Sequence, residues 1–147
     1  MSAPLKYSDF GPMDELFTHI EPDGVTIRTF NITWLLQRTA DGTITPLRTD
    51  ILMTPENYAG VLQNNGVEES HVETLDVSEQ MKPLMFAAFK DNEYVLIDGN
   101  HRAVKAYRQG RYLMPARIYE QSQWEQCLVD TGPLPSWFIN HIKGVAS

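Results

Sequence analysis

Residues 94–110 read YVLIDGNHRAVKAYRQG, and residues 114–119 read MPARIY. The first four residues form a short apolar run, which is typical of a strand buried on both faces. From Asn100 the apolar residues recur with the period of a helix, and Gly110 is a residue type that often ends one. Residues 114–119 resemble a second strand in length and composition. The stretch therefore predicts a strand, a tight turn, a helix and another strand.

The turn between the first strand and the helix carries five consecutive polar or glycine residues, Asp98-Gly99-Asn100-His101-Arg102. The N–H groups and the dipole at a helix N-terminus favour an anion there. Gly99 can adopt a positive φ angle and lets a ligand approach the backbone. Arg102 has a planar guanidinium that suits phosphate or carboxylate. The same residues also fit structural roles, as helix caps, as a partner for a buried carbonyl, or as one half of a surface ion pair.

We predict that this turn binds a nucleotide or another phosphate ligand. The residues expected to contact the ligand are Gly99, Asn100, His101, Arg102 and Lys105. Asp98 and His101 are the candidate catalytic groups, because a carboxylate or an imidazole can act as a general base. The expected cofactor is ATP or another nucleotide with Mg²⁺. No dedicated metal site is predicted, since the four histidines lack metal-binding spacing and Asp76 and Glu79 are typical of a solvated surface.

The rest of the chain predicts further short elements. Turn-forming residues make 1–24 an irregular N-terminal segment that includes a short helix at 13–20. Asp41-Gly42 is a hairpin signal between the apolar run at 34–36 and a returning strand at 43–45. Thr54 and Pro55 are typical of a helix start. The remaining expected elements are a strand at 25–32, a strand at 71–77, a buried strand at 83–89, a helix at 122–129 and a helix from Ser136.

Strands interleaved with helices predict an α+β (mixed α/β) fold, in which a small mixed sheet is flanked by helices. The length of 147 residues suits a single domain over 1–147, with a C-terminal helical extension at 120–147. We expect the strands around Phe86 and Val95 to pair as a hairpin at the centre of the sheet. No apolar run is long enough for a membrane span, and the first residues lack the apolar core of a signal peptide. We therefore expect a soluble, cytoplasmic protein with no membrane partner.

The formal net charge is −7, with 19 acidic and 12 basic residues. This balance argues against non-specific nucleic-acid binding, which depends on neutralising phosphates. Five of the 12 basic residues nevertheless lie within a single stretch of 16 positions that falls on the motif: Arg102, Lys105, Arg108, Arg111 and Arg117. The one cysteine, Cys127, cannot form an internal disulfide, and its neighbours favour a buried core position.

The motif resembles the ParB/sulfiredoxin-like superfamily. Its members share a strand, a Gly-x-[His/Arg]-Arg turn, an alanine-rich helix and a strand entered through proline, as at 96–110 and 114–118 here. The resemblance implies that the turn binds nucleotide phosphates, as it does for CTP in ParB-type partition proteins and for ATP in sulfiredoxins and free serine kinases. Asn100 stands where sulfiredoxins have their catalytic cysteine, so sulfinic-acid reductase chemistry is not expected. No helix-turn-helix is recognised after the motif, so ParB-type DNA recognition is not expected either.

Two classes of function are left open. The first is a nucleotide-dependent enzyme, such as a phosphotransferase, an ATPase or a nuclease. The second is a non-catalytic effector or regulatory module that binds a protein partner with its surface. The fold does not decide between them.

Overall fold

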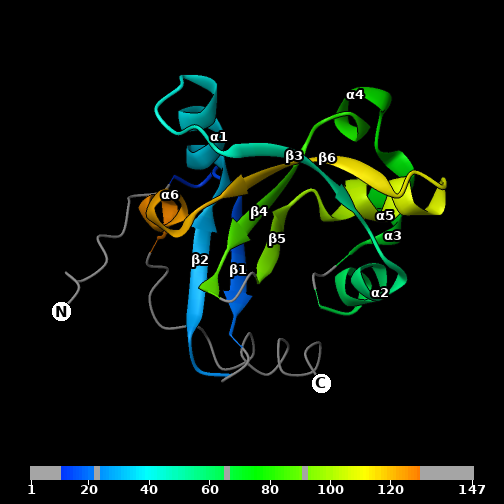
Figure 1. Ribbon diagram of the computed structural model, residues 1–147, viewed down its shortest axis with the longest axis horizontal. Helices are drawn as coiled ribbons and strands as arrows, with labels where there is room; N and C mark the ends of the chain where they lie inside the picture. The colour runs from blue at the N-terminus through cyan, green and yellow to red at the C-terminus, as the bar shows by residue number, and fades with distance from the viewer. Residues whose placement is uncertain (1–10, 22–23, 65–66, 91–92, 130–147) are drawn as a thin grey trace. The chain divides into compact units, whose positions relative to one another are not determined.

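The computed structural model describes residues 11–21, 24–64, 67–90 and 93–129. These residues form a mixed α+β fold, as predicted (Figure 1). The elements in chain order are β1 Leu16–Ile20, β2 Ile27–Asn31, α1 Ile32–Ala40, β3 Leu47–Leu52, α2 Pro55–Asn64, α3 Glu69–Thr74, α4 Val77–Gln80, β4 Leu84–Ala88, β5 Tyr94–Asp98, α5 Asn100–Arg108, β6 Leu113–Tyr119, α6 Gln121–Trp124 and a 3₁₀ turn Glu125–Cys127. Strands β1 and β2 form one sheet, and the other has the order β3-β6-β4-β5. None of the helices in the described ranges is both long and apolar enough to span a bilayer.

The described residues group into two compact units, which we treat separately. Unit 1 contains the residues up to Leu47, then Phe86–Asp98, and those from Ile118 on. Unit 2 contains Arg48–Met85 and Gly99–Arg117. The prediction of one domain over residues 1–147 stays a prediction.

Unit 1 is built around a large aromatic core. Trp124 and Phe30 are almost completely buried and meet edge to face, with ring centroids 5.6 Å apart. The Trp124 indole N–H donates to the Ala88 carbonyl at 2.8 Å, so the polar atom of this large side chain is satisfied. Cys127 is also fully buried, which confirms its interpretation as a core residue.

Two predictions in unit 1 are wrong. The helix expected at 13–20 is instead the strand β1, which pairs antiparallel with β2 from Leu16 opposite Asn31 to Ile20 opposite Ile27. The hairpin expected around Asp41-Gly42 is instead the end of helix α1. Asp41 caps that helix through its backbone N–H, and Gly42 follows with a φ angle of 82°. The positive φ of Gly42 therefore follows the end of a helix and does not join two strands.

Helix α1 also begins at a capping residue that was not predicted. The Asn31 side chain accepts a hydrogen bond from the Trp34 backbone N–H at 3.0 Å. This is the geometry of an N-cap, which satisfies one of the free N–H groups of the first turn. Ile32 and Leu35 then lie three residues apart and are both fully buried.

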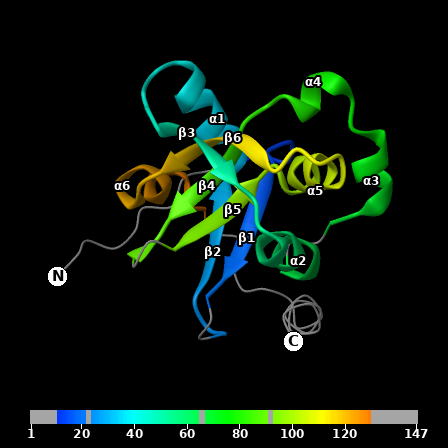
Figure 2. The ribbon, with the colours of Figure 1, turned by 45° about the vertical axis from the view of Figure 1, so that its right-hand side comes forward.

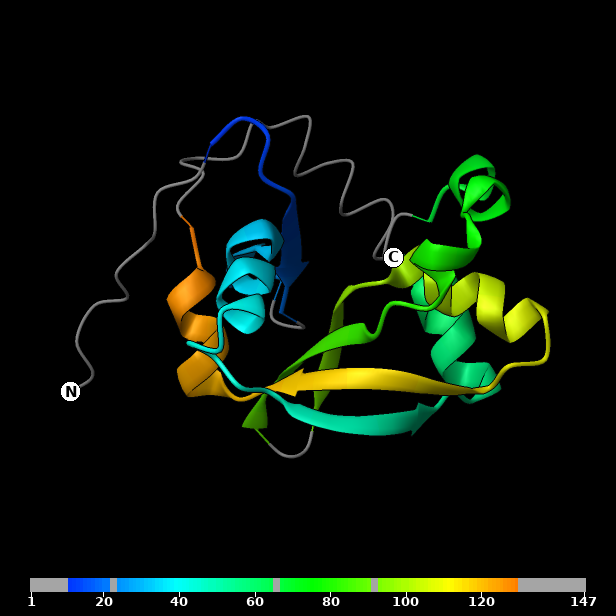
Figure 3. The same cartoon turned by 90° about the horizontal axis from the view of Figure 1, so that it is seen from above.

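Unit 2 places its helices around α5. Helices α2, α3 and α4 each pack against it, as Figure 2 shows. The rings of Tyr58 on α2 and Tyr107 on α5 are stacked, with centroids 4.2 Å apart. Strands β3 and β6 lie side by side (Figure 3). The predicted start of α2 is confirmed, because Thr54 and Asn57 exchange backbone and side-chain hydrogen bonds.

The strand expected at 71–77 is wrong, because these residues belong to helices α3 and α4 and the link between them. Val72 is buried but Val77 is 75% exposed, so the apolar residues do not line one face of a strand. Asp76 instead caps α4 by accepting from the Glu79 N–H at 2.8 Å. This local bond competes with an extended backbone.

The central part of the sequence motif is confirmed as a strand, turn, helix and strand at β5, α5 and β6. Strands β4 and β5 are neighbours, but β5 is the edge strand of its sheet, so the expected central position is wrong for β5. Near the C-terminal end, α6 and the 3₁₀ turn cover 121–127 in place of one helix at 122–129. The helix expected from Ser136 lies outside the described residues.

Candidate functional site

Gly99 has the conformation that the sequence predicts. Its φ angle is 97°, a left-handed value that residues with a side chain rarely adopt, and it precedes the first residue of α5. A Cβ atom at this position would lie 2.7 Å from Leu84 Cδ2 and 2.9 Å from Arg102 Nη2. The backbone angle therefore requires glycine, and any larger residue would also have to displace the ends of the Leu84 and Arg102 side chains.

Arg102 lies against this turn. Its guanidinium folds back toward Gly99, and Nη2 donates to the Pro83 carbonyl at 3.1 Å. A fixed positive charge thus sits beside the N-terminus of α5. Since the helix dipole is also positive there, the two effects add to a field that favours an anion.

His101 contacts helix α3 and the residue before it. Its Nε2 accepts a hydrogen bond from the Glu68 backbone N–H at 3.1 Å, and its ring stacks on that of His71 with centroids 4.0 Å apart. Partial burial lowers the pKa of His101, the electrostatic effect of His71 lowers it further, and Glu68 opposes the shift. His101 is therefore held in its neutral form, because only an unprotonated Nε2 can accept the Glu68 N–H.

Lys105 binds the other end of α3. Its Nζ donates to the carbonyls of Glu73 at 3.2 Å and Leu75 at 3.1 Å. A cation near the last carbonyls of a helix is stabilised by the helix dipole. His101 and Lys105 together thus attach α3 to α5. Of the other predicted site residues, Asn100 is buried at the start of α5 and Asp98 is half-buried at the end of β5.

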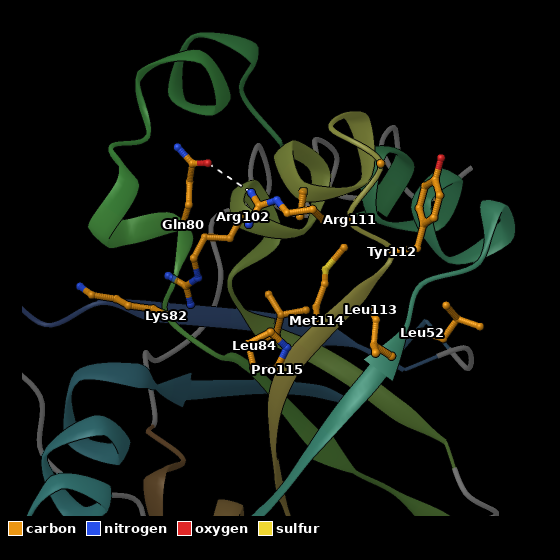
Figure 4. A pocket seen from close by; sticks show the side chains of 12 residues that line it. Leu52, Gln80, Lys82, Leu84, Arg102, Arg111, Tyr112, Leu113, Met114 and Pro115 are labelled. Carbon is orange, nitrogen blue, oxygen red and sulfur yellow. Dashed lines mark hydrogen bonds between the residues drawn. The ribbon is translucent and has the colours of Figure 1, made fainter.

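A cavity of about 440 Å³ lies next to Arg102 within unit 2. Figure 4 shows its side chains: Leu52, Gln80, Lys82, Leu84, Arg102, Ala106, Gly110, Arg111, Tyr112, Leu113, Met114 and Pro115. Three of these residues are cationic and none is acidic. Leu84, Ala106 and Met114 are buried and form an apolar floor. We call this space the first cavity.

The cations of the first cavity have different partners. Lys82 forms an ion pair with Glu79 at 2.7 Å. Arg111 instead donates from Nη2 to two amide oxygens, Gln109 Oε1 at 2.7 Å and Gln80 Oε1 at 3.2 Å. Among the residues that the structure describes, no carboxylate pairs with Arg111. Its charge is therefore held by neutral groups that an anionic ligand can replace.

Arg102 was predictable from the sequence as a ligand-binding residue, but the cavity was not. Arg111 belonged to the basic cluster noted in the sequence, so its charge was a usable signal. Lys82 had no such signal, because it reaches the cavity from the segment before β4. His101 and Lys105, which were expected to face a ligand, contact α3 and the backbone around it.

No metal centre is found in the described part of the chain, which contains no group of three His, Cys, Asp or Glu side chains able to hold an ion. Asp76 instead caps α4, and the backbone N–H of Glu79 lowers the pKa of its carboxyl. Glu79 pairs with Lys82. Both acids thus have the surface roles that the sequence favours.

Comparison with known proteins identifies no relative. No protein-family model, no curated protein and no solved structure matches the chain. The resemblance to the ParB/sulfiredoxin-like superfamily therefore stays a prediction, and the function has to be argued from the site.

Proposed function

We propose that the first cavity binds a nucleotide or another phosphate-containing small molecule, with Arg102 and Arg111 holding the phosphate. The observation that carries this proposal is the pair of guanidiniums lining a cavity with no carboxylate. The chain as a whole has an excess of acidic residues, so such a cavity is a local exception. Guanidinium groups bind phosphate oxygens through two parallel hydrogen bonds.

The shape and polarity of the cavity suit a ligand with one charged and one apolar end. A volume of about 440 Å³ lies within the range of small-molecule pockets. The floor of Leu84, Ala106 and Met114 offers an apolar surface for a base. A phosphate at Arg111 would replace bonds to neutral amides by charge-assisted bonds, which are about twice as strong.

Binding is better supported than catalysis. His101 would have to give up its bond to the Glu68 N–H before its Nε2 could act as a base. We therefore propose binding first. Catalysis as a phosphotransferase, an ATPase or a nuclease, with Asp98 and His101 as catalytic residues, is a second step of the proposal.

The test is calorimetric titration of the full chain with ATP, ADP, CTP and GTP, each with and without Mg²⁺. Replacing Arg111 by Gln should weaken nucleotide binding by roughly 1.5–3 kcal/mol, the range for hydrogen bonds to charged groups. Arg38→Gln is the matched control, because Arg38 is a partly exposed arginine of α1 in unit 1. The nucleotide affinity of Arg38→Gln should equal that of the wild type.

Absence of binding by every nucleotide at millimolar concentration would overturn the proposal. An equal loss of affinity in Arg111→Gln and Arg38→Gln would also count against it, because it would indicate an effect of net charge alone. The alternative of a protein-binding module is favoured by three exposed apolar residues at the rim: Leu52, Tyr112 and Leu113. Nucleotide-independent binding of a protein that is lost in Leu113→Ser would support it.

A further inference from the structure

A second cavity adjoins the first within unit 2. It has a volume of about 340 Å³ and is lined by Arg48, Thr49, Asp50, Pro83, Pro115, Ala116 and Arg117. Pro115 lines both cavities. Pro83 lines the second cavity and also accepts the hydrogen bond from Arg102, which lines the first. The two cavities therefore meet along these two prolines, and we call them together the groove.

The second cavity is also cationic. Arg48 on β3 and Arg117 on β6 come from neighbouring strands. The Arg117 Nε atom is buried, and no hydrogen-bond partner for it exists among the described residues. A buried donor that is left unsatisfied costs free energy, and a bound anion can remove this cost. Asp50 is the one acidic residue that lines this cavity.

The charge of the groove contrasts with that of the chain. Five of the 12 basic residues line it, namely Lys82, Arg102, Arg111, Arg48 and Arg117. Among the described residues, Asp50 is the only one of the chain's 19 acidic residues that lines the groove. The cations thus form two groups, one group lining each cavity, and the prolines lie between the two groups. A ligand that uses both needs at least two anionic groups.

The strand geometry gives a length for the groove along β6. Leu113 lines the first cavity and Arg117 the second, and the two residues are four positions apart on β6. At about 3.3 Å per residue this is a distance of roughly 13 Å. A single phosphate cannot span it, whereas a short chain of several linked nucleotides can.

The groove also offers an aromatic surface. Tyr112 lines the first cavity, is 47% exposed, and is supported edge-on by Tyr107 at a centroid distance of 5.0 Å. Exposed aromatic rings beside a basic track are the surfaces on which bases of single-stranded nucleic acids stack.

We propose that the groove binds a phosphodiester-linked ligand, namely a short single-stranded oligonucleotide. This inference rests on the proposed function and specifies its ligand class. One phosphate of the ligand lies between Arg102 and Arg111. The backbone of the ligand then crosses Pro115, and a second phosphate lies between Arg48 and Arg117. A base stacks on Tyr112.

The experiment compares dTMP with oligothymidylates of two and four nucleotides, by calorimetry on the full chain. The four-nucleotide ligand should bind at least about tenfold more tightly than dTMP. Arg48→Gln and Arg117→Gln should abolish this gain, so that each variant binds the four-nucleotide ligand no more tightly than it binds dTMP. Arg48 is exposed, so its variant keeps the test informative if Arg117→Gln fails to fold. Each lost phosphate contact should reduce the slope of log K against log salt by about 0.7.

The outcomes separate the two proposals. Equal affinity for dTMP and the longer ligands would overturn the oligonucleotide inference and leave the proposed function standing. Failure of all of these ligands and of all nucleotides to bind would overturn both. Equal competition by an acidic peptide such as oligoglutamate would overturn the inference, because the groove would then select charge alone.

Discussion

Helices α1 and α3 are both short, yet they are held in different ways. Helix α1 in unit 1 buries Ile32 and Leu35 completely. Helix α3 in unit 2 buries Val72 and is otherwise attached by polar contacts to α5, including a two-pronged pair of Arg108 with Glu69 at 2.6 and 2.8 Å. Water and salt compete with exposed polar contacts but not with a dry core. Helix α3 should therefore detach more easily than α1, which is part of a buried core.

The largest expected effect is in α1. Leu35→Ala should lower the free energy of unfolding by about 2–5 kcal/mol, because it leaves a cavity in a closed core. The measurement is urea denaturation followed by tryptophan fluorescence. The neighbouring Leu36 is 37% exposed, so Leu36→Ala is the control and should cost less than about 1 kcal/mol. Equal losses would show that α1 is not held by its buried face.

The matching change in α3 should cost less. Val72→Ala removes the equivalent of two methylene groups, which corresponds to about 1.6 kcal/mol. Val77→Ala serves as control, since Val77 is 75% exposed and its replacement should be nearly neutral. The same denaturation experiment applies. A loss as large as that of Leu35→Ala would contradict the view that α3 depends mainly on polar contacts.

The core of unit 1 should also protect its thiol. Burial raises the pKa of Cys127 to about 12, so almost no thiolate exists at pH 8. We expect labelling by a thiol reagent to be at least about a thousandfold slower in the native protein than in urea. Cys127→Ala should cost about 1 kcal/mol, the value for a methyl-sized cavity. Rapid native labelling would show that this core opens readily.

The smallest effect should be the pH dependence of the α3 contact. Because the pKa of His101 is lowered in the folded state, its contribution to stability is complete above the ordinary histidine pKa of about 6.5. It is lost as the pH falls through the folded value, since protonation removes the acceptor for the Glu68 N–H and adds repulsion from His71.

His101→Gln keeps an acceptor oxygen but cannot titrate, so its melting temperature should fall less than that of the wild type between pH 7 and pH 5. His19 in unit 1 also has a pKa lowered by burial, and its contribution should persist in the variant. If the melting temperatures of both proteins changed equally with pH, protonation of His101 would not be what weakens the α3 contact.

Locally encoded features of the motif were predictable. Gly99 needs a positive φ at the start of α5, and the period of the apolar residues identifies that helix directly. Helix α2 was equally predictable, because its cap is local: Thr54 accepts a hydrogen bond from the backbone N–H of Asn57, three residues away. Strand β1 was not, because it is stabilised by pairing with β2 and not by its own residues.

The sequence alone determined the α+β class, the strand-turn-helix-strand motif and a cluster of cations near it, because backbone preferences and periodicity act over a few residues. Only the tertiary structure decided which of those cations face a cavity. His101 and Lys105 turn toward α3, which lies some 30 residues away in the chain, while Arg102, Arg111 and Arg117 line the groove. Arg48 joins them because β3 pairs with β6. Side-chain partners are chosen by packing between distant segments, and no local pattern carries that information.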